Sequence, residues 1–275
     1  CYKNLNDLKN AFLQFCHSVP FYGQVILCAD SEELMSIKDK ITKPLVTYGL
    51  SKKADYCAQN IIYNKNKSEY TLFHKQKNIG KIKIEVPGKH NVLNSLAAIA
   101  LGIEIDIPIE KLKNGINNYK GVRRRFELKT NKHKVTLIDD YAHHPTEVLA
   151  TINAAKSGWD KKIISVFQPH LFSRTKDFFK EFAKSLFISD EIIITDIYPA
   201  REKPIKGVTS NLIIDELKCL GHKKTHYLDD LEKLNQLLDT LVTPDDMVIT
   251  MGAGNIWRYN EKYNDHLNKD NHFTI

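Results

Sequence analysis

The 275-residue sequence predicts an α/β fold: a mixed sheet in the first part, followed by a Rossmann-like, mostly parallel sheet with helices on both faces. From Val135 onward, strand patterns alternate with helix patterns, which is typical of a parallel sheet. Residues 54–86 read instead as an antiparallel meander with polar turns. With 42% hydrophobic residues, the chain can bury a sizeable core, and its length favours roughly two domains.

The first part combines short strands with helices. QVILCAD predicts a strand before the meander. After the meander, apolar side chains follow a helical spacing: Val92, Leu93, Leu96, Ala97 and Ala100. Gly102 is expected to stop this helix, and PIEKLKNGINNYKGV predicts another short one. We place the domain boundary at Gly121, which gives domains of residues 1–121 and 122–275.

The second part repeats a strand, a turn and a helix. The pairs are VTLIDDYA with PTEVLATINAAK, KIISVFQ with TKDFFKEFAKSLF, EIIITDIY with SNLIIDELKCL, THYL with DLEKLNQLLDTLV, and MVITMGAG with a last helix. In such sheets, ligands bind beyond the carboxyl ends of the strands. We therefore expect any functional site of this part at the strand exits.

The composition argues against several classes of protein. The formal net charge of +7 suits an anionic partner, but the lysines are dispersed, so we do not predict nucleic-acid binding. There is no run of about 18 apolar residues and no secretory pattern at the N-terminus, so we expect a cytoplasmic protein without membrane insertion. The five cysteines include no CxxC pair, which argues against a zinc site or a disulfide framework, and we expect most to be buried thiols.

Four unusual segments follow strands of the second part: DDYAHHPTE, FQPHLFSRT, DIYPAREKPIKGV and MGAGN. Each alone is an ordinary polar loop. Together they place reactive side chains at one sheet edge, which favours a shared site: His143, His144, His170, Arg174, Tyr198, Arg201, Glu202 and Asn255.

His143 is the candidate proton acceptor or donor of this edge. It lies beside Pro145, which suits the first position of a helix, and a nearby carboxylate would fix its tautomer. Adjacent histidines rarely converge on one ion, so we predict no metal site here. His170 and Arg174 suit a carboxylate or a phosphate, with a surface ion pair as the alternative. Asp139 and Asp140 suit either a structural turn or a ribose hydroxyl.

Two asparagines of the first part, Asn91 and Asn94, lie near the start of a predicted helix in GKHNVLNSLAA. Their amides suit two uses. They can cap the helix, or they can bind a base edge with one donor and one acceptor. Residue chemistry alone leaves both uses open.

Six motifs in this order resemble the Mur ligase family: GKHNVLNSLAA, GVRRRFE, DDYAHHPTE, FQPHLFSRT, YPAREKPIKGV and GAGNI. The resemblance covers the whole chain. The HHPTE and FQPH...SRT pair is most similar to the member that joins L-alanine to UDP-N-acetylmuramate for peptidoglycan. It implies an ATP-dependent ligase in which the lactyl carboxylate becomes an acyl phosphate and the alanine amine then displaces phosphate.

The resemblance also implies roles for individual residues. Those matching nucleotide-binding positions are Asn91, Asn94, Arg125 and Asp140. Those matching catalytic or substrate-facing positions are Tyr141, His143, His170 and Arg174, with Glu202 and Asn255 as weaker matches. Many relatives have an arginine where this chain has Leu171. Two alternatives follow from the resemblance: either Arg174 carries more of the anion binding, or that neighbour does not matter.

One motif of the family is absent from this sequence. No GxxxxGK[ST] phosphate loop is present, and PGKHN lacks its spacing and its Ser or Thr. The resemblance places that loop, and the Mg²⁺ ligands, upstream, so we interpret residues 1–121 as part of a central ATP-binding domain and expect the chain alone to be inactive. The alternatives are another Mur-type ligase, or a nucleotide-binding module without chemistry.

Overall fold

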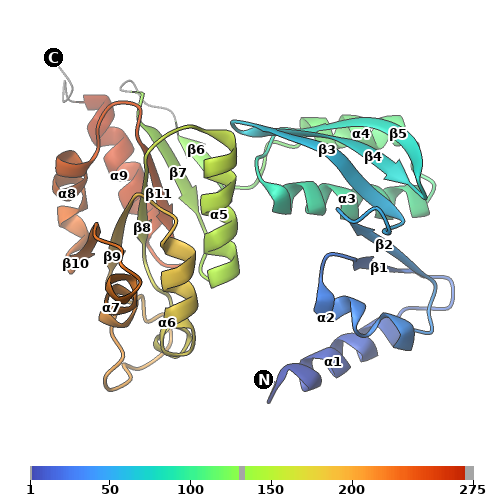
Figure 1. Cartoon of the computed structure of the whole chain (residues 1–275), viewed down its shortest axis with the longest axis horizontal. Coiled ribbons are helices and arrows are strands. Elements are labelled where there is room, and N and C mark those ends of the chain that lie inside the picture. Colours follow the sequence, from blue (N-terminus) through green and yellow to red (C-terminus); the bar gives the residue numbers. More distant parts are fainter. Residues whose placement is uncertain (1, 130–133, 270–275) are drawn as a thin grey trace. The chain divides into compact units, whose positions relative to one another are not determined.

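A computed structural model describes residues 2–129 and 134–269. The chain divides into two compact units, Cys1–Lys120 and Gly121–Ile275. This division lies one residue from the boundary expected from the sequence. Each unit is described by itself (Figure 1).

The first unit is built on a five-stranded mixed sheet in the order β1-β2-β3-β4-β5. Its elements are α1 (Leu5–His17), β1 (Val25–Cys28), α2 (Glu32–Met35), η1 (Lys38–Lys40), β2 (Leu45–Gly49), β3 (Tyr56–Asn64), β4 (Lys67–His74), β5 (Lys77–Ile84), α3 (Lys89–Glu104) and α4 (Ile109–Asn118). Strands β1 to β3 are parallel, and β3 to β5 form the predicted antiparallel meander. Helix α3 packs on this sheet through Val92, Leu96 and Ile99, which are fully buried.

The sequence suggested that Gly102 would stop the helix, and this prediction was wrong. It lies inside α3, which continues to Glu104. A β-carbon at position 102 would collide with the side chain of Leu112 on α4. The glycine is therefore explained by the close packing of α3 against α4.

The second unit is the predicted, mostly parallel sheet, in the order β10-β9-β8-β11-β7-β6. Its elements are β6 (Glu127–Lys129), β7 (Thr136–Asp140), α5 (Pro145–Gly158), β8 (Ile163–Phe167), α6 (Phe172–Leu186), β9 (Glu191–Thr195), α7 (Asn211–Cys219), β10 (Thr225–Leu228), η2 (Leu231–Lys233), α8 (Leu234–Leu241), β11 (Met247–Met251) and α9 (Ile256–Lys269). All neighbouring strands run parallel except the short edge strand β6, which pairs antiparallel with β7. The sequence analysis did not predict β6.

Helices cover both faces of this second sheet (Figure 1). One apolar core joins the sheet to α5, α6 and α7, and a second core joins it to α8 and α9. Every residue of β8, β9 and β11 is buried. Strands buried on both faces read as continuous apolar runs, which is why the sequence pattern identified them.

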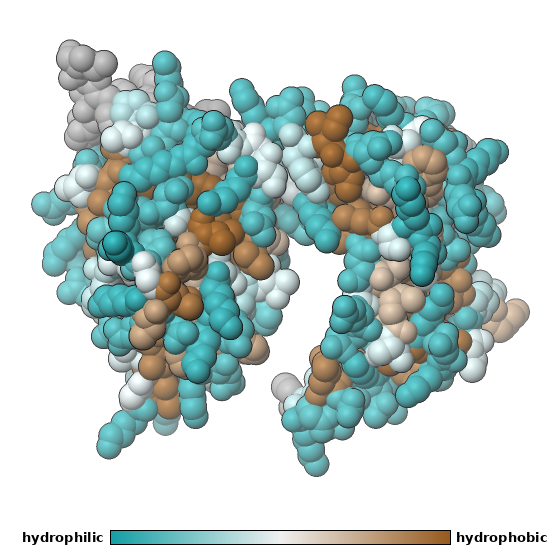
Figure 2. Space-filling model, in the orientation of Figure 1, coloured by the Kyte–Doolittle hydropathy of each residue, from teal (hydrophilic) through white to brown (hydrophobic). Residues whose placement is uncertain are grey.

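The surface is mostly hydrophilic. Hydrophilic residues cover most of the visible face of each unit (Figure 2). Within residues 2–129 and 134–269, no helix is long and apolar enough to cross a membrane. The four described cysteines are free thiols; Cys16 and Cys57 are buried, Cys28 is partly buried and Cys219 is exposed. Cys1 lies outside the described residues.

Candidate functional site

The exits of four parallel strands meet at the carboxyl edge of the second sheet. Strand β11 pairs with β7 on one side and with β8 on the other, and β8 pairs with β9. A further bridge between His170 and Tyr198 continues the β8–β9 pairing beyond the strands. The loops that the sequence singled out therefore converge, as expected for a doubly wound sheet.

Four aromatic rings form a row along this edge. The Tyr141 and His143 ring centroids are 5.1 Å apart, and those of His143 and His170 are 6.0 Å apart. His170 then stacks on Tyr198, with centroids 5.8 Å apart and planes 12° from parallel. The structure thus brings together four residues that the sequence analysis had assigned to the site: Tyr141, His143, His170 and Tyr198.

His143 is held in a defined tautomer. Its Nδ1 lies 2.8 Å from the carbonyl oxygen of Tyr141 and 3.2 Å from Oε2 of Glu147. A carbonyl only accepts hydrogen bonds, so Nδ1 carries the proton and the lone pair of the neutral ring is on Nε2. This is the arrangement that a proton acceptor requires.

His170 is a neutral ring with an unused nitrogen. Its Nδ1 is buried and has no hydrogen-bond partner among the described residues. Burial lowers the pKa of His170, the charges of Arg174 and His143 lower it further, and Glu202 opposes them. A buried nitrogen without a partner at this edge suits a polar ligand.

Arg174 belongs to the first turn of α6, and Glu202, from the loop after β9, contacts the same helix start. Arg174 donates from Nη1 to the His143 carbonyl at 3.4 Å, which places the guanidinium beside the histidine pair. Glu202 accepts from the Ser173 amide at 2.9 Å and from its hydroxyl at 2.5 Å. These hydrogen bonds, together with the charge of Arg174, lower the pKa of Glu202. In this structure Glu202 caps α6, and its predicted contact with substrate stays a prediction.

Asp140 is directed into the protein. Its carboxylate accepts from the amides of Phe126 and Ala142 and from the hydroxyl of Thr151, at 2.9 to 3.2 Å. Burial raises the pKa of Asp140 to about 6, against the lowering effect of these bonds. The carboxylate fixes the chain around the strand exit, and the predicted ribose contact stays a prediction.

Asn255 belongs to a glycine turn that follows β11. Its Oδ1 accepts from Nε2 of Gln168 at 2.9 Å, while Oε1 of Gln168 accepts from the amide of Ile256 at 3.2 Å. A β-carbon at Gly254 would collide with Oε1 of Gln168 and lie 2.6 Å from Cγ of Tyr198. The glycine therefore allows the turn to approach Tyr198 closely.

Arg124, which the sequence analysis did not assign to the site, anchors the same edge. Its guanidinium donates to the carbonyls of Gly252 and Gly254 and lies 4.8 Å from the centre of the Tyr141 ring. The triple arginine was visible in the sequence, but only Arg125 was assigned a role, and that from the family resemblance. The contact of Arg124 with the glycine carbonyls became visible only in the fold.

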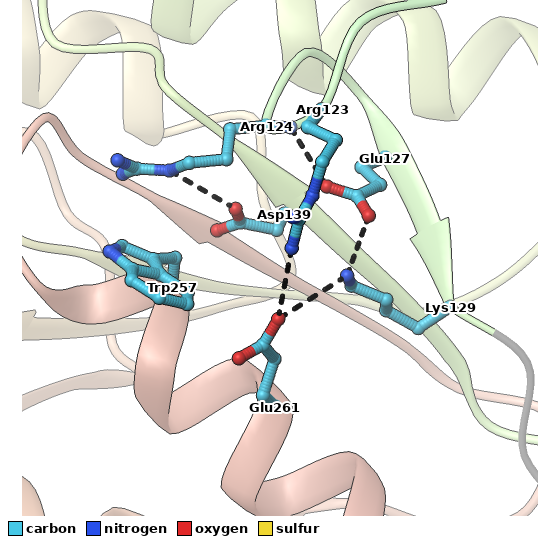
Figure 3. A pocket seen from close by; sticks show the side chains of 7 residues that line it. All are labelled: Arg123, Arg124, Glu127, Lys129, Asp139, Trp257 and Glu261. Atoms are coloured by element: carbon cyan, nitrogen blue, oxygen red, sulfur yellow. Dashed lines mark hydrogen bonds and ion pairs between the residues drawn. The ribbon is translucent and has the colours of Figure 1, made fainter. Parts of the chain in front are cut away.

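A cavity of about 300 Å³ lies beside Arg124 (Figure 3). Its lining residues are Arg123, Arg124, Glu127, Lys129, Asp139, Trp257 and Glu261. The three cations and three carboxylates form ion pairs with one another, for example Arg124 with Asp139 and Lys129 with Glu127. Because these charges balance, the cavity is not an evident anion site.

The first unit holds Asn91 and Asn94 in a cavity of about 310 Å³. Its lining residues are Ile84, Val86, Asn91, Asn94, Ser95, Ala98, Gly115, Ile116 and Tyr119. Nδ2 of Asn91 donates to the Pro87 carbonyl at 2.7 Å. Helix α3 has no side-chain cap. A slot lined by apolar side chains and two amides has a shape and chemistry suited to a planar heterocycle, and the base-binding role of Asn91 and Asn94 stays a prediction.

The described residues contain no group of three or more His, Cys, Asp or Glu side chains suited to a metal ion.

The second unit defines a doubly wound α/β domain with its candidate ligand site beyond the carboxyl ends of its strands. Family models identify both units further. Residues 124–254 match the Mur ligase glutamate ligase domain, and residues 1–102 match the Mur ligase middle domain. The chain belongs to the Mur ligase family.

Curated relatives are similar over nearly the whole chain. A UDP-N-acetylmuramate–L-alanine ligase of Geotalea uraniireducens is 41% identical over 98% of this chain and 59% of its own length. One of Salinibacter ruber is 40% identical over 98% of the chain and 57% of its own length. The chain thus spans less than two thirds of these relatives.

Solved structures share the fold. MurC of Thermotoga maritima matches with a TM-score of 0.77 and 26% identity, covering 96% of this chain and 55% of that one. MurF of the same organism, in complex with ADP, matches with a TM-score of 0.75 and 17% identity, covering 96% of this chain and 58% of that one. The second likeness concerns the fold alone.

Proposed function

We propose that the protein containing this chain ligates L-alanine to UDP-N-acetylmuramate at the expense of ATP, in peptidoglycan precursor synthesis. The relatives named for this reaction support the substrates. The observation that carries the proposal is the convergence of His143, His170 and Arg174 at one strand edge. An arginine and two histidines suit a reaction that brings a carboxylate and an amine together.

The proposed chemistry has two steps. The lactyl carboxylate attacks the γ-phosphorus of ATP, which gives an acyl phosphate and ADP. The amine of L-alanine then attacks the acyl carbon, a C–N bond forms, and phosphate leaves. The ammonium group of L-alanine must lose protons during these two steps. Nε2 of His143 carries the free lone pair that accepts one of them.

Arg174 is proposed to bind a substrate carboxylate, because guanidinium pairs with such groups through two parallel hydrogen bonds. His170 is neutral, because burial and the charge of Arg174 lower its pKa. Its buried Nδ1 is then available for a hydrogen bond to substrate. Tyr141, Glu202 and Asn255 are proposed as further substrate contacts.

The nucleotide is assigned to four residues. In the first unit, Asn91 and Asn94 are proposed to bind the adenine edge, with Tyr119 and apolar side chains against the ring. In the second unit, Arg125 is proposed to contact the nucleotide and Asp140 the ribose. Magnesium is expected with ATP, and we assign none of its ligands to the described residues. We propose a cytoplasmic location and no nucleic-acid partner.

The test is phosphate release by the full-length protein that contains this chain, with ATP, magnesium and UDP-N-acetylmuramate. L-alanine is compared with glycine, L-serine, D-glutamate and no amino acid. We expect release to depend on L-alanine. Release that depends on another amino acid would assign the chain to another Mur-type ligase, and release with none would contradict the proposed reaction.

Two variants test the site in the same assay. Arg174→Ala and His143→Ala are each expected to lower turnover by about 100-fold, because the first removes a group that binds negative charge and the second removes the proton acceptor. Lys184→Ala is the matched control, since it removes a cation from an exposed position of the same helix. Equal activity of the control and the two variants would contradict the assigned roles.

A further inference from the structure

Glu147 contacts two residues to which the proposed function gives different tasks. Its Oε2 accepts from the amides of His143 and His144, at 3.0 and 3.2 Å, and lies 3.2 Å from Nδ1 of His143. Its Oε1 lies 3.7 Å from Nη1 of Arg125. One carboxylate thus faces a proposed nucleotide arginine with one oxygen and a proposed proton acceptor with the other.

A helix cap explains only part of this arrangement. Glu147 is the third residue of α5 and completes a capping box with the N-cap residue His144. In that motif, Glu147 needs to accept only one hydrogen bond, which the amide of the N-cap residue donates. The contacts with the His143 amide, the His143 ring and Arg125 are additional.

The direction of the Arg125 side chain depends on a partner such as the Glu147 carboxylate. Its side chain is 52% exposed. Its guanidinium lies 5.4 Å from the centre of the Tyr141 ring. An exposed arginine has many rotamers, and fixing one of them costs conformational entropy. The Glu147 carboxylate and the Tyr141 ring together restrict Arg125 to one direction.

The orientation of His143 depends on the same carboxylate. Tyr141 and Glu147 both face Nδ1, so both favour the tautomer that leaves Nε2 free. Burial opposes ionisation of Glu147, but the His143 amide and the charges of His143 and Arg125 lower its pKa on balance. The carboxylate is therefore charged when both partners are in place.

We propose that Glu147 is a positioning residue that holds Arg125 and His143 at the same time, so that the nucleotide contact and the proton acceptor share one support. This inference rests on the proposed roles of Arg125 and His143. It adds a link between them that neither residue provides alone. Because the two oxygens belong to one rigid group, displacing either partner displaces the other.

Glu147→Gln separates this role from a simple cap. The amide oxygen of glutamine can still accept the backbone bonds at the helix start. Its NH₂ group, however, must replace one of the two acceptors and then faces a donor on Arg125 or on His143. Glutamine therefore keeps the helix but cannot hold both partners.

The experiment is a set of mutant cycles in the full-length ligase. We expect Glu147→Gln to raise KM for ATP and to lower kcat, each on the order of 10-fold. Adding Arg125→Ala should then raise KM for ATP by less than it does in the wild type, and adding His143→Ala should lower kcat by about 10-fold in place of about 100-fold, because part of each residue's effect is already lost. Fully additive effects, or a Glu147→Gln enzyme equal to the wild type, would overturn the proposal.

A matched control separates these effects from a general loss of stability. Thr209→Ala removes the hydroxyl that accepts from the Asn211 amide at 3.3 Å at the start of α7, so it weakens a different helix start of the same unit. We expect its kinetic constants to stay within about twofold of the wild type, because the hydrogen bond of this cap involves neither Glu147 nor its two partners. Equal losses in this control would show that any weakened helix start is sufficient, and would overturn the proposal.

If Glu147→Gln fails to fold, the cycle of Arg125→Ala and His143→Ala still decides. We expect their combined effect on kcat/KM to be smaller than the product of the single effects, by about threefold or more. Additivity in this cycle overturns the proposal. A wild-type enzyme without alanine-dependent phosphate release would instead contradict the proposed function itself.

Discussion

His170 lies in surroundings that change its protonation. Burial and the charges of Arg174 and His143 lower its pKa from the ordinary value of 6.5. The unfolded chain therefore binds a proton more readily than the folded one between these two pKa values. The contribution to stability is complete above pH 6.5 and is lost as the pH falls through the folded-state pKa.

This gives a pH prediction for the 275-residue chain. We expect NMR titration of the His170 ring to give a midpoint below 6.5, and Arg174→Gln to raise that midpoint by removing a positive neighbour. The exposed Lys184→Gln on the same helix should leave the midpoint unchanged. A midpoint at or above 6.5 in the wild type would contradict the burial of this ring.

Sequence reasoning at the residue scale could place side chains at an edge but could not orient them. His143 and His170 could be predicted as neighbours because both follow parallel strands. The inward direction of Asp140 could not, since Asp139 and Asp140 are both buried on a strand covered on both faces. Alternation therefore gave no sign of which carboxylate faces a ligand.

At the scale of elements, the turn between β11 and α9 controls the spacing of the site. Gly254 lies so close to Tyr198 that a β-carbon would be 2.6 Å from Cγ of that ring. Tyr198 in turn stacks on His170. A methyl group added at Gly254 should therefore displace the row of rings.

We expect Gly254→Ala to lower the free energy of unfolding by about 1–3 kcal/mol, because it overpacks a filled contact. In the full-length protein it should also lower turnover on the order of 10-fold, because it displaces Tyr198 and the His170 ring. Urea denaturation of the chain and the phosphate-release assay measure the two effects. Unchanged stability together with unchanged turnover would show that the turn can move without cost.

The elements of the second sheet were predictable because their patterns are long and continuous. Strands β8, β9 and β11 are apolar runs separated by helices, and the fold follows from them. The edge strand β6 was missed because it has only three residues, one of them the exposed Leu128. Gly102 was read as a stop because sequence spacing cannot reveal that Leu112 of another helix packs against it.

At the scale of the whole molecule, burial differs greatly between segments. The central strands β8 and β11 have every residue buried, between two apolar cores. Helix α1 has only Cys16 buried, and Phe12 and Phe15 are among its exposed side chains. Local stability follows buried apolar contacts, so these segments should open with very different free energies.

Hydrogen exchange of the 275-residue chain at pH 7 measures this difference. We expect amides of β8 and β11 to exchange only through global opening of the second unit. Amides of α1 should exchange at least about 100-fold faster, through local opening. Because β3, β4 and β5 have their own core with α3, their amides should form a third class, independent of β11. A single common rate for α1, β4 and β11 would mean that the two units unfold as one cooperative body, contrary to the separate cores from which each unit is built.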